Sequence, residues 1–474
     1  MISVQSHRLL LNGNRIGVFI LLSFLLLSTG ACALFNKAST SPTTNPDTKP
    51  AEEVKPRPTI PVEKVDTMEW KKPDEKTTTG PIRKQEVIIP DHPEKVNIPK
   101  KDKYNVGVLL PLYSQLQKDV LNDNVLKMVH FASGLRMAVS KLRQENVSLN
   151  IKVLDIEFHS NRLEDLIAAD SLKEFDFIVG PFKADHLQTL SAYCRKEGKV
   201  LVSPWNTSPS ITKDNPFYFQ LNPGLKVHCE AISKDIISNF KSSQVVLVAR
   251  EMDTREKDYF PYFTNSVAFK SSPTHKNKIS QLLMKSDKSG RLSGEAIRNK
   301  MVENQTTVFI VPYWAEEAFI LQFLHALNRE VSDKYPVVVY GLPQWLEFGK
   351  LTYDLFEKLQ VRLSYSGFID KSDPEVISFR QTFFDQNGVL PLEDAFYGHD
   401  VMYWLGTEIK RTKSDFINKV HKKHQTGLFN PIDLHRISYS GGAVSDNFST
   451  FDITENQAIS IIRLVDYRFR IANQ

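Results

Sequence analysis

From residue 104 onward, the chain alternates between continuous apolar runs and segments with apolar residues at helical spacing. Apolar runs that end in Gly or Pro are typical of strands buried on both faces of a parallel sheet. Four such runs occupy residues 106–112, 149–157, 175–180 and 199–204. Helices are predicted between them, at residues 125–142, 163–175 and 185–196.

The same pattern then restarts in the second half of the chain. Strands are predicted at residues 243–250, 306–314, 336–343 and 362–369, with a strong helix at 315–330. Two series of βαβ units predict an α/β protein with two Rossmann-like, parallel-sheet lobes. We expect the first lobe at about 104–222 plus 370–435, and the second at about 223–369 plus the C-terminal strands. A hinge joins the lobes, and a cleft between them is the natural ligand site.

The N-terminus has the pattern of a bacterial lipoprotein signal peptide. Arg8 and Arg15 form a basic start, residues 16–27 are an apolar core too short to span a bilayer, and Thr29-Gly30-Ala31 precede Cys32. Residues 1–31 are therefore predicted to be cleaved. Cys32 would become a diacylated N-terminus, with palmitate among its acyl chains, and would anchor the protein to a lipid bilayer. The alternatives are an ordinary signal peptide with a chance cysteine, or an uncleaved anchor.

Residues 32–103 differ in composition from the rest of the chain. Pro recurs, Lys and Glu alternate, and large apolar residues are sparse. Such a segment cannot bury enough apolar surface to order itself, so we predict a disordered tether. Its reach would be roughly 45 Å as a coil and up to about 200 Å if largely polyproline-like. A periplasmic domain could thus work far from its membrane. Cys32 is not followed by aspartate, which favours the outer membrane over the inner.

Charge and cysteine content exclude some partners and cofactors. The 60 Lys and Arg residues and 55 Asp and Glu residues give a net charge of +5, but they are interspersed along the chain. No basic stripe is present for nucleic acid, so nucleic acid is not expected as a partner. Cys194 and Cys229 fall in separate predicted helices, and we expect free buried thiols. No metal or cofactor is expected.

Residues 179–224 carry a family resemblance, together with FASGLRMAV (131–139), GFIDKSDPEVISFRQTF (367–383) and AFYGHDVMYWL (395–405). They resemble the type I periplasmic-binding-protein fold of leucine/isoleucine/valine-binding proteins. The shared features are a strand ending in Gly, a helix, a strand ending in Ser-Pro, a turn, and an aromatic strand that leads to the second lobe. The resemblance covers roughly residue 104 to the C-terminus. It implies an amino-acid-binding protein of an ABC transporter or a receptor.

The resemblance also implies a site in which hydroxyls and backbone groups at strand ends bind a ligand carboxylate. Thr207 matches the pocket threonine, and Trp205 supplies a backbone position. Two departures stand out, since Ala184 replaces the pocket serine and Asn206 replaces an alanine. Tyr313 and Trp314 would either stack on a ligand or pack against the next helix. The candidate ligand-binding residues are Ala184, Asp185, Trp205, Asn206, Thr207, Tyr313 and Trp314.

Enzyme motifs are weak in this sequence. Residues 210–213 match S-x-x-K, but no K-T-G follows and the match falls in a predicted turn. His421 and His424 stand one helical turn apart with two lysines between them, which favours a solvated face over a metal site. Neither a nucleophile elbow nor a phosphate-binding loop is present in the sequence. We therefore expect a non-enzyme.

Two functions from different classes stay open. The first is a lipoprotein whose lobes close on a small polar, amino-acid-like ligand for transport or sensing. The second is an interaction protein of the cell envelope. Lipoprotein activators of penicillin-binding proteins also contain this fold, so the partner would be a protein of peptidoglycan synthesis. The long tether and the altered pocket favour the second function, and the frequency of the fold in receptors favours the first.

Overall fold

The computed structural model describes residues 98–114, 122–157, 161–208, 210–241, 243–275, 279–285, 292–420, 427–428, 431–439 and 451–472. All of the described residues lie in one compact unit, residues 86–474. Cys32, most of the predicted tether, His421 and His424 lie outside the described residues. Their predicted roles therefore stay predictions.

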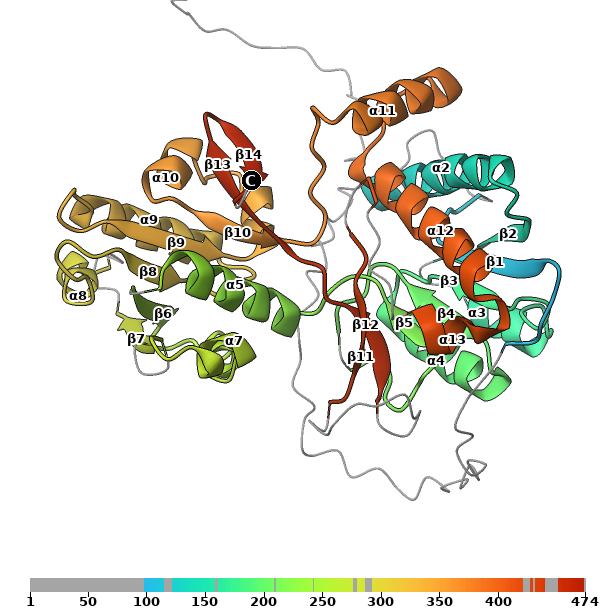
Figure 1. The fold of residues 1–474 in the computed structure, drawn as a ribbon, viewed down its shortest axis with the longest axis horizontal. Helices are drawn as coiled ribbons and strands as arrows, with labels where there is room; N and C mark the ends of the chain where they lie inside the picture. Colours follow the sequence, from blue (N-terminus) through green and yellow to red (C-terminus); the bar gives the residue numbers. More distant parts are fainter. Residues whose placement is uncertain are drawn as a thin grey trace, which may run out of the picture. The chain divides into compact units, whose positions relative to one another are not determined.

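This unit contains two seven-stranded sheets with helices around them, as the sequence predicts (Figure 1). The first sheet has six parallel strands, and β11 pairs antiparallel to β12 at one edge. Its spatial order is β11 (Leu434–Ile437), β12 (Ile453–Asn456), β5 (Tyr218–Gln220), β4 (Val200–Ser203), β3 (Phe177–Val179), β1 (Tyr104–Leu110) and β2 (Leu149–Asp155).

The second sheet repeats the same arrangement of parallel strands. Five strands run parallel, and β13 and β14 complete one edge as an antiparallel pair. Its spatial order is β14 (Arg468–Ile471), β13 (Ser460–Val465), β10 (Arg362–Tyr365), β9 (Val337–Gly341), β8 (Thr307–Ile310), β6 (Gln244–Arg250) and β7 (Ile279–Met284). The two-lobe α/β architecture is thus confirmed.

Helices cover both faces of the first sheet, because its strands are apolar on both sides. Val106 and Val108 of β1 pack into the core under α2 (Asp123–Gln144) and α12 (Glu393–Thr412). Leu109 points to the opposite core, which α3 (Arg162–Ala168) and α4 (Ala184–Glu197) cover. This alternation places the sheet between two helical layers.

Two glycines allow α2 and α12 to pack closely. A Cβ on Gly134 would lie 1.8 Å from the carbonyl oxygen of Ala395, and one on Gly398 would lie 2.1 Å from that of Phe131. No side chain fits at such distances. The motifs FASGLRMAV and AFYGHDVMYWL, which carry part of the family resemblance, therefore form one helix–helix contact.

One large core holds the second lobe together. Val246, Phe309 and Val339 from its central strands are fully buried there. Among the described residues, its helices are α5 (Leu225–Asn239), α6 (Phe260–Thr264), α7 (Val267–Ser271), α8 (Gly294–Arg298), α9 (Glu317–Glu330) and α10 (Tyr353–Lys358). Helices α5 and α10 both contact the β10–β13 edge of the sheet. Helices α11 (Pro374–Asn387) and α13 (Phe416–Lys419) belong to the chain segment around α12.

The chain passes between the sheets after β5, after β10 and after β12. We expected the strands after residue 435 to lie in the second lobe. β13 and β14 do, whereas β12 pairs in parallel with β5 in the first sheet. The difference arises because a short strand pattern does not specify its partner, and the partner of β12 is chosen by tertiary contacts. One of these is the hydrogen bond from Asn456 Nδ2 to the carbonyl of Leu221 at 3.0 Å.

Element ends differ from the predictions by a few residues. α3 ends at Ala168 instead of 175, because Asp170 adopts a left-handed backbone with φ 57°. β8 ends at Ile310, so that Tyr313 and Trp314 lie in the segment beyond the strand. This shift bears on the candidate site, since residues past a strand end are free to turn back into the core.

Candidate functional site

Asp155 occupies an anion-binding position at the carboxyl end of the first sheet. Its carboxylate accepts hydrogen bonds from the backbone N–H groups of Leu112 at 2.8 Å, Tyr113 at 3.0 Å and Ser114 at 2.6 Å. The hydroxyl of Ser114 adds a fourth bond at 2.7 Å. Successive amides of this kind form a nest that binds anions. Here the nest holds the chain's own carboxylate.

Trp205 follows β4 and packs its indole ring into an aromatic cluster. The ring centroid lies 4.7 Å from that of Phe131 and 5.6 Å from that of Phe182. Its backbone carbonyl accepts a hydrogen bond from Asn222 Nδ2 at 3.1 Å. The ring and the carbonyl of Trp205 therefore have partners within the protein, whereas its indole Nε1 is buried with no hydrogen-bond partner among the described residues.

Asn206 and Thr207 differ in whether their side-chain polar groups form hydrogen bonds within the chain. Asn206 is buried, and its amide nitrogen donates to the carbonyl of Ser208 at 3.1 Å and to the hydroxyl of Tyr218 at 3.3 Å. Thr207 is half-buried, and its hydroxyl makes no hydrogen bond to another described residue. Its carbonyl lies 3.2 Å from where a Cβ on Gly224 would be. Thr207 therefore sits beside the first crossing to the second lobe.

The start of α4 offers no hydroxyl. Ala184 is half-buried at the first position of the helix, and no side chain caps this helix end. Asp185 is exposed and lies 3.5 Å from the ammonium of Lys183. An exposed ion pair of this kind contributes little to stability. The replacement of the pocket serine thus leaves this side of the site without a side-chain hydroxyl, although the first backbone N–H groups of the helix have no side-chain cap.

Tyr313 belongs to the core of the second lobe. It is fully buried, its hydroxyl donates to Asp253 Oδ2 at 2.7 Å, and it accepts from the backbone N–H of Arg250 at 2.8 Å. Burial raises the pKa of this hydroxyl. Its ring packs on Phe319 of α9 at 4.6 Å. Of the two roles expected for Tyr313, it therefore has the second, which is packing against the next helix.

Trp314 is half-buried and lies edge-on to the ring of His228, with centroids 6.3 Å apart. His228 is buried near the start of α5, and its Nδ1 lies 3.0 Å from the hydroxyl of Ser364. Burial lowers the pKa of His228 to about 4. The imidazole is therefore neutral at physiological pH and acts as a packing and hydrogen-bonding group.

Polar contacts between the lobes were not predicted from the sequence. The hydroxyl of Tyr365, at the end of β10, donates to Glu393 Oε2 of α12 at 3.3 Å. The hydroxyl of Ser366 donates to Asn222 Oδ1 at 3.3 Å. Glu393 looks like an ordinary acidic residue in the first turn of a helix, so nothing in the sequence distinguishes it.

Glu455 of β12 forms a second polar centre at the crossings. Its Oε1 accepts from the backbone N–H of Gly224 at 2.9 Å and from Gln220 Nε2 at 3.1 Å. Burial raises its pKa, and the Gly224 and Gln457 hydrogen bonds oppose that rise. A Cβ on Gly224 would come within 2.9 Å of this carboxylate. Gly224 is therefore required where the first and third crossings meet.

The start of α12 is acidic. Desolvation raises the pKa of Glu393, and its hydrogen bond with Tyr365 opposes the rise. Desolvation also raises the pKa of Asp394 to about 6, while the charge of Lys127 lowers it. Carboxylates at this helix start would repel a ligand carboxylate and attract a ligand ammonium, so they do not exclude a zwitterionic amino acid.

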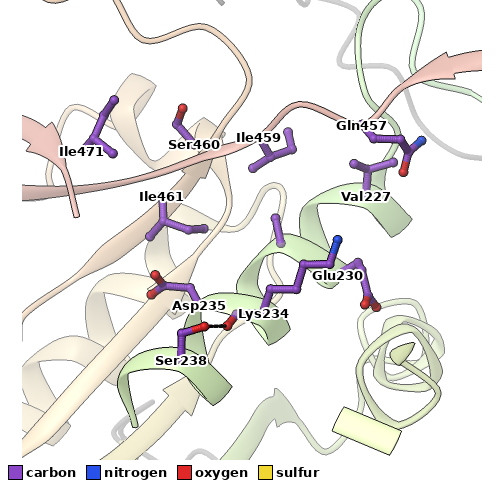
Figure 2. Close-up of a pocket in the computed structure, with 11 residues that line it drawn as sticks. Val227, Glu230, Lys234, Asp235, Ser238, Gln457, Ile459, Ser460, Ile461 and Ile471 are labelled. Carbon is purple, nitrogen blue, oxygen red and sulfur yellow. Dashed lines mark hydrogen bonds between the residues drawn. The ribbon is translucent and has the colours of Figure 1, made fainter. Parts of the chain in front are cut away.

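A separate pocket lies on the second lobe, between α5 and β13, and has a volume of about 360 Å³ (Figure 2). Its polar side chains come mainly from α5, and its apolar walls come from both elements. The lining residues are Val227, Glu230, Ala231, Lys234, Asp235, Ser238, Gln457, Ile459, Ser460, Ile461 and Ile471. None of them was a candidate from the sequence.

Cysteine, metal and membrane features complete the inventory of the described residues. Cys194 and Cys229 are free and buried, as predicted, and burial raises the pKa of both thiols. The part of the chain that the structure describes has no cluster of three His, Cys, Asp or Glu residues suited to a metal ion. Among the described helices, none is both long and apolar enough to cross a bilayer.

Solved structures of similar fold establish the architecture. A putative branched-chain amino acid ABC transporter protein from Rhodospirillum rubrum matches 78% of this chain and 99% of its own, with 14% identity and a TM-score of 0.55. The chain has the type I periplasmic-binding-protein fold. Full-length LpoA from Haemophilus influenzae matches 79% of this chain and 60% of its own, with 14% identity and a TM-score of 0.50. No family model and no curated protein matches the sequence.

Proposed function

We propose that this chain is a non-enzymatic interaction protein of the bacterial cell envelope, an activator or scaffold that contacts a protein of peptidoglycan synthesis. The supporting observation is that the expected ligand site lacks the hydroxyl that the resemblance implies and that two of its polar groups are bonded within the chain. Ala184 supplies no hydroxyl, Asn222 donates to the carbonyl of Trp205, and the amide of Asn206 donates to Ser208 and Tyr218. A ligand there would have to compete with these hydrogen bonds.

The proposal includes attachment to the periplasmic face of a membrane, with the outer membrane favoured. Cys32 would carry the acyl chains, and residues 32–103 would be the tether. Cys32→Ser should release the protein into the soluble periplasmic fraction or leave the precursor uncleaved. A variant that fractionates like the wild type would remove the anchor from the proposal.

The test of the function compares two kinds of variant in cells. If the protein works by binding a partner through its surface, Thr207→Val should fully complement a deletion of the gene. Charge reversals on an exposed lobe face should not complement it. Both proteins should be folded and equally abundant by immunoblot. The interaction function would be refuted if the charge-reversal variants complemented the deletion and Thr207→Val did not.

A second candidate is a binding protein for a small polar, amino-acid-like ligand. Its support is the half-buried Thr207 hydroxyl, which has no hydrogen-bond partner among the described residues. A specific ligand must raise the free energy of unfolding by mass action, by about 2.7 kcal/mol at a hundred times its Kd, and with it the melting temperature. A panel of amino acids, short peptides and muropeptides tests this directly. A shift that Thr207→Val abolishes would favour this candidate over the first.

A further inference from the structure

A row of three arginines crosses the outer edge of the second sheet. Arg362 of β10 pairs in register with Arg463 of β13, and Arg463 pairs with Arg470 of β14. Directly opposed residues of antiparallel strands project to the same face. Arg362 Nη1 lies 2.8 Å from Asp235 of α5, so this is the face that α5 contacts. The row therefore runs outward from beneath α5.

Among the described residues, only the innermost of these arginines forms an ion pair, the one between Arg362 and Asp235. Asp235 is buried and also accepts hydrogen bonds from the hydroxyl of Tyr340 and from Asn239.

Arg463 and Arg470 form no ion pair with any described residue. The Nε of Arg463 is buried without a hydrogen-bond partner. Asp370 is close enough to sense the charge of Arg470, but its carboxylate is held by Ser372. Like charges directly opposite each other on neighbouring strands destabilise a sheet. An unbalanced row of this kind is therefore suited to an anionic group from outside the chain.

The pocket between α5 and β13 adds a fourth cation and apolar walls beside this row. Lys234 is exposed and has no counter-ion among the described residues. Figure 2 shows its side chain extending from α5 in the same pocket as Ile459, which lies in the segment between β12 and β13. The carboxylate of the neighbouring Glu230 accepts from the backbone N–H groups of Val267 at 3.1 Å and Ala268 at 3.0 Å.

The edge of the sheet is open on the same side. β14 pairs only with β13 among the described strands, so one row of its backbone N–H and C=O groups has no partner in the sheet. Phe469 packs against Tyr353 and Phe356 of α10, on the opposite face from α5. Arg468 and Arg470, which alternate with Phe469, therefore project to the α5 side.

We propose that Lys234, Arg463, Arg468 and Arg470, here called the basic edge, form the docking surface for an acidic, extended segment of a partner protein. The inference rests on the proposed interaction function and names the surface and the chemistry of the partner. Such a segment can pair with the open edge of β14 and place its alternate carboxylates on the arginines. A small inorganic anion would not use the open strand edge.

The test uses the full chain in detergent and a fluorescent seven-residue peptide that alternates glutamate with valine. In an extended conformation this peptide has all its carboxylates on one side. We expect fluorescence anisotropy to show binding that weakens as salt increases. A Lys234→Glu, Arg470→Glu double variant should bind at least about tenfold more weakly. The counterpart peptide with lysine in place of glutamate should not bind.

A matched control reverses two exposed basic residues of the first lobe, Arg143→Glu and Lys196→Glu, and should bind within about twofold of the wild type. Absence of peptide binding, or equal loss in the control, overturns the proposal. Full displacement of the peptide by millimolar inorganic phosphate, with no dependence on peptide length, would assign the basic edge to small anions instead. Complementation by Thr207→Val is independent of this assay, so failure here leaves the proposed function separately testable.

Discussion

The carboxyl edge of the first sheet and the outer edge of the second sheet use their polar groups in opposite ways. At the first, Asp155, Trp205 and Asn206 are bonded to other parts of the chain. At the second, Arg463 and Arg470 face each other and form no ion pair with a described residue. Groups that satisfy one another stabilise a fold, whereas unbalanced charges cost stability and are free to bind. The comparison predicts that substitutions destabilise the first region and not the second.

Trp205→Ala should produce the largest effect. Removal of an indole packed on Phe131 and Phe182 should lower the free energy of unfolding by about 3 kcal/mol, since it leaves a cavity. Urea unfolding measures this, with the exposed Tyr467→Ala as a control that should change little. A near-normal stability for Trp205→Ala would show that the ring is available to a ligand and would break the comparison.

Asp155→Ala should lower the free energy of unfolding by about 2 kcal/mol, because four hydrogen bonds to a carboxylate are lost and their donors are left facing each other. Denaturant unfolding measures the change. The same variant should bind phosphate more tightly than the wild type does. Asp155→Asn should show a smaller gain in phosphate affinity. No gain in phosphate binding would mean that the nest collapses without its carboxylate.

Asp394 differs from Asp155 of the same lobe, because its carboxylate is desolvated and not stabilised by a set of hydrogen bonds. Desolvation raises the pKa of Asp394 to about 6. The native state therefore holds this proton more tightly than the unfolded chain, whose aspartates titrate near 3.9. Stability from this group is fully present below about pH 4 and is lost as the pH rises through about 6.

Asp394→Asn should consequently be more stable than the wild type at pH 7.5, by about 1 kcal/mol, and equal to it at pH 4. Urea midpoints at the two pH values measure the difference. Asp102→Asn, which removes an exposed carboxylate, is the control and should show no such crossover. An equal effect at both pH values would contradict the raised pKa.

Arg470→Glu should produce the smallest change in the free energy of unfolding, and the change should be stabilising. Replacing a like-charge pair with an opposite-charge pair across β13 and β14 should raise the free energy of unfolding by about 0.5 kcal/mol. Arg468→Glu, whose cross-strand neighbour is Val465, is the matched control and should change stability less. Destabilisation by Arg470→Glu would show that Arg470 already has a partner, and would remove the contrast between the two edges.

The two series of βαβ units can be predicted from the amino-acid pattern alone, because a strand buried on both faces must be a continuous apolar run. The sequence also shows the departures at the site, since Ala184 and Asn206 are visible without any structure. The buried state of Cys194 and Cys229 followed from their place on apolar helix faces.

Which polar groups find partners depends on tertiary contacts that local patterns do not specify. The sheet that β12 joins, the burial of Tyr313 and the contact of Tyr365 with Glu393 depend on segments far apart in the chain. The row of Arg362, Arg463 and Arg470 depends on strand register, and a shift of one residue would send each side chain to the other face. Local patterns specify whether a residue is in a strand, but register and pairing follow from packing across the whole lobe.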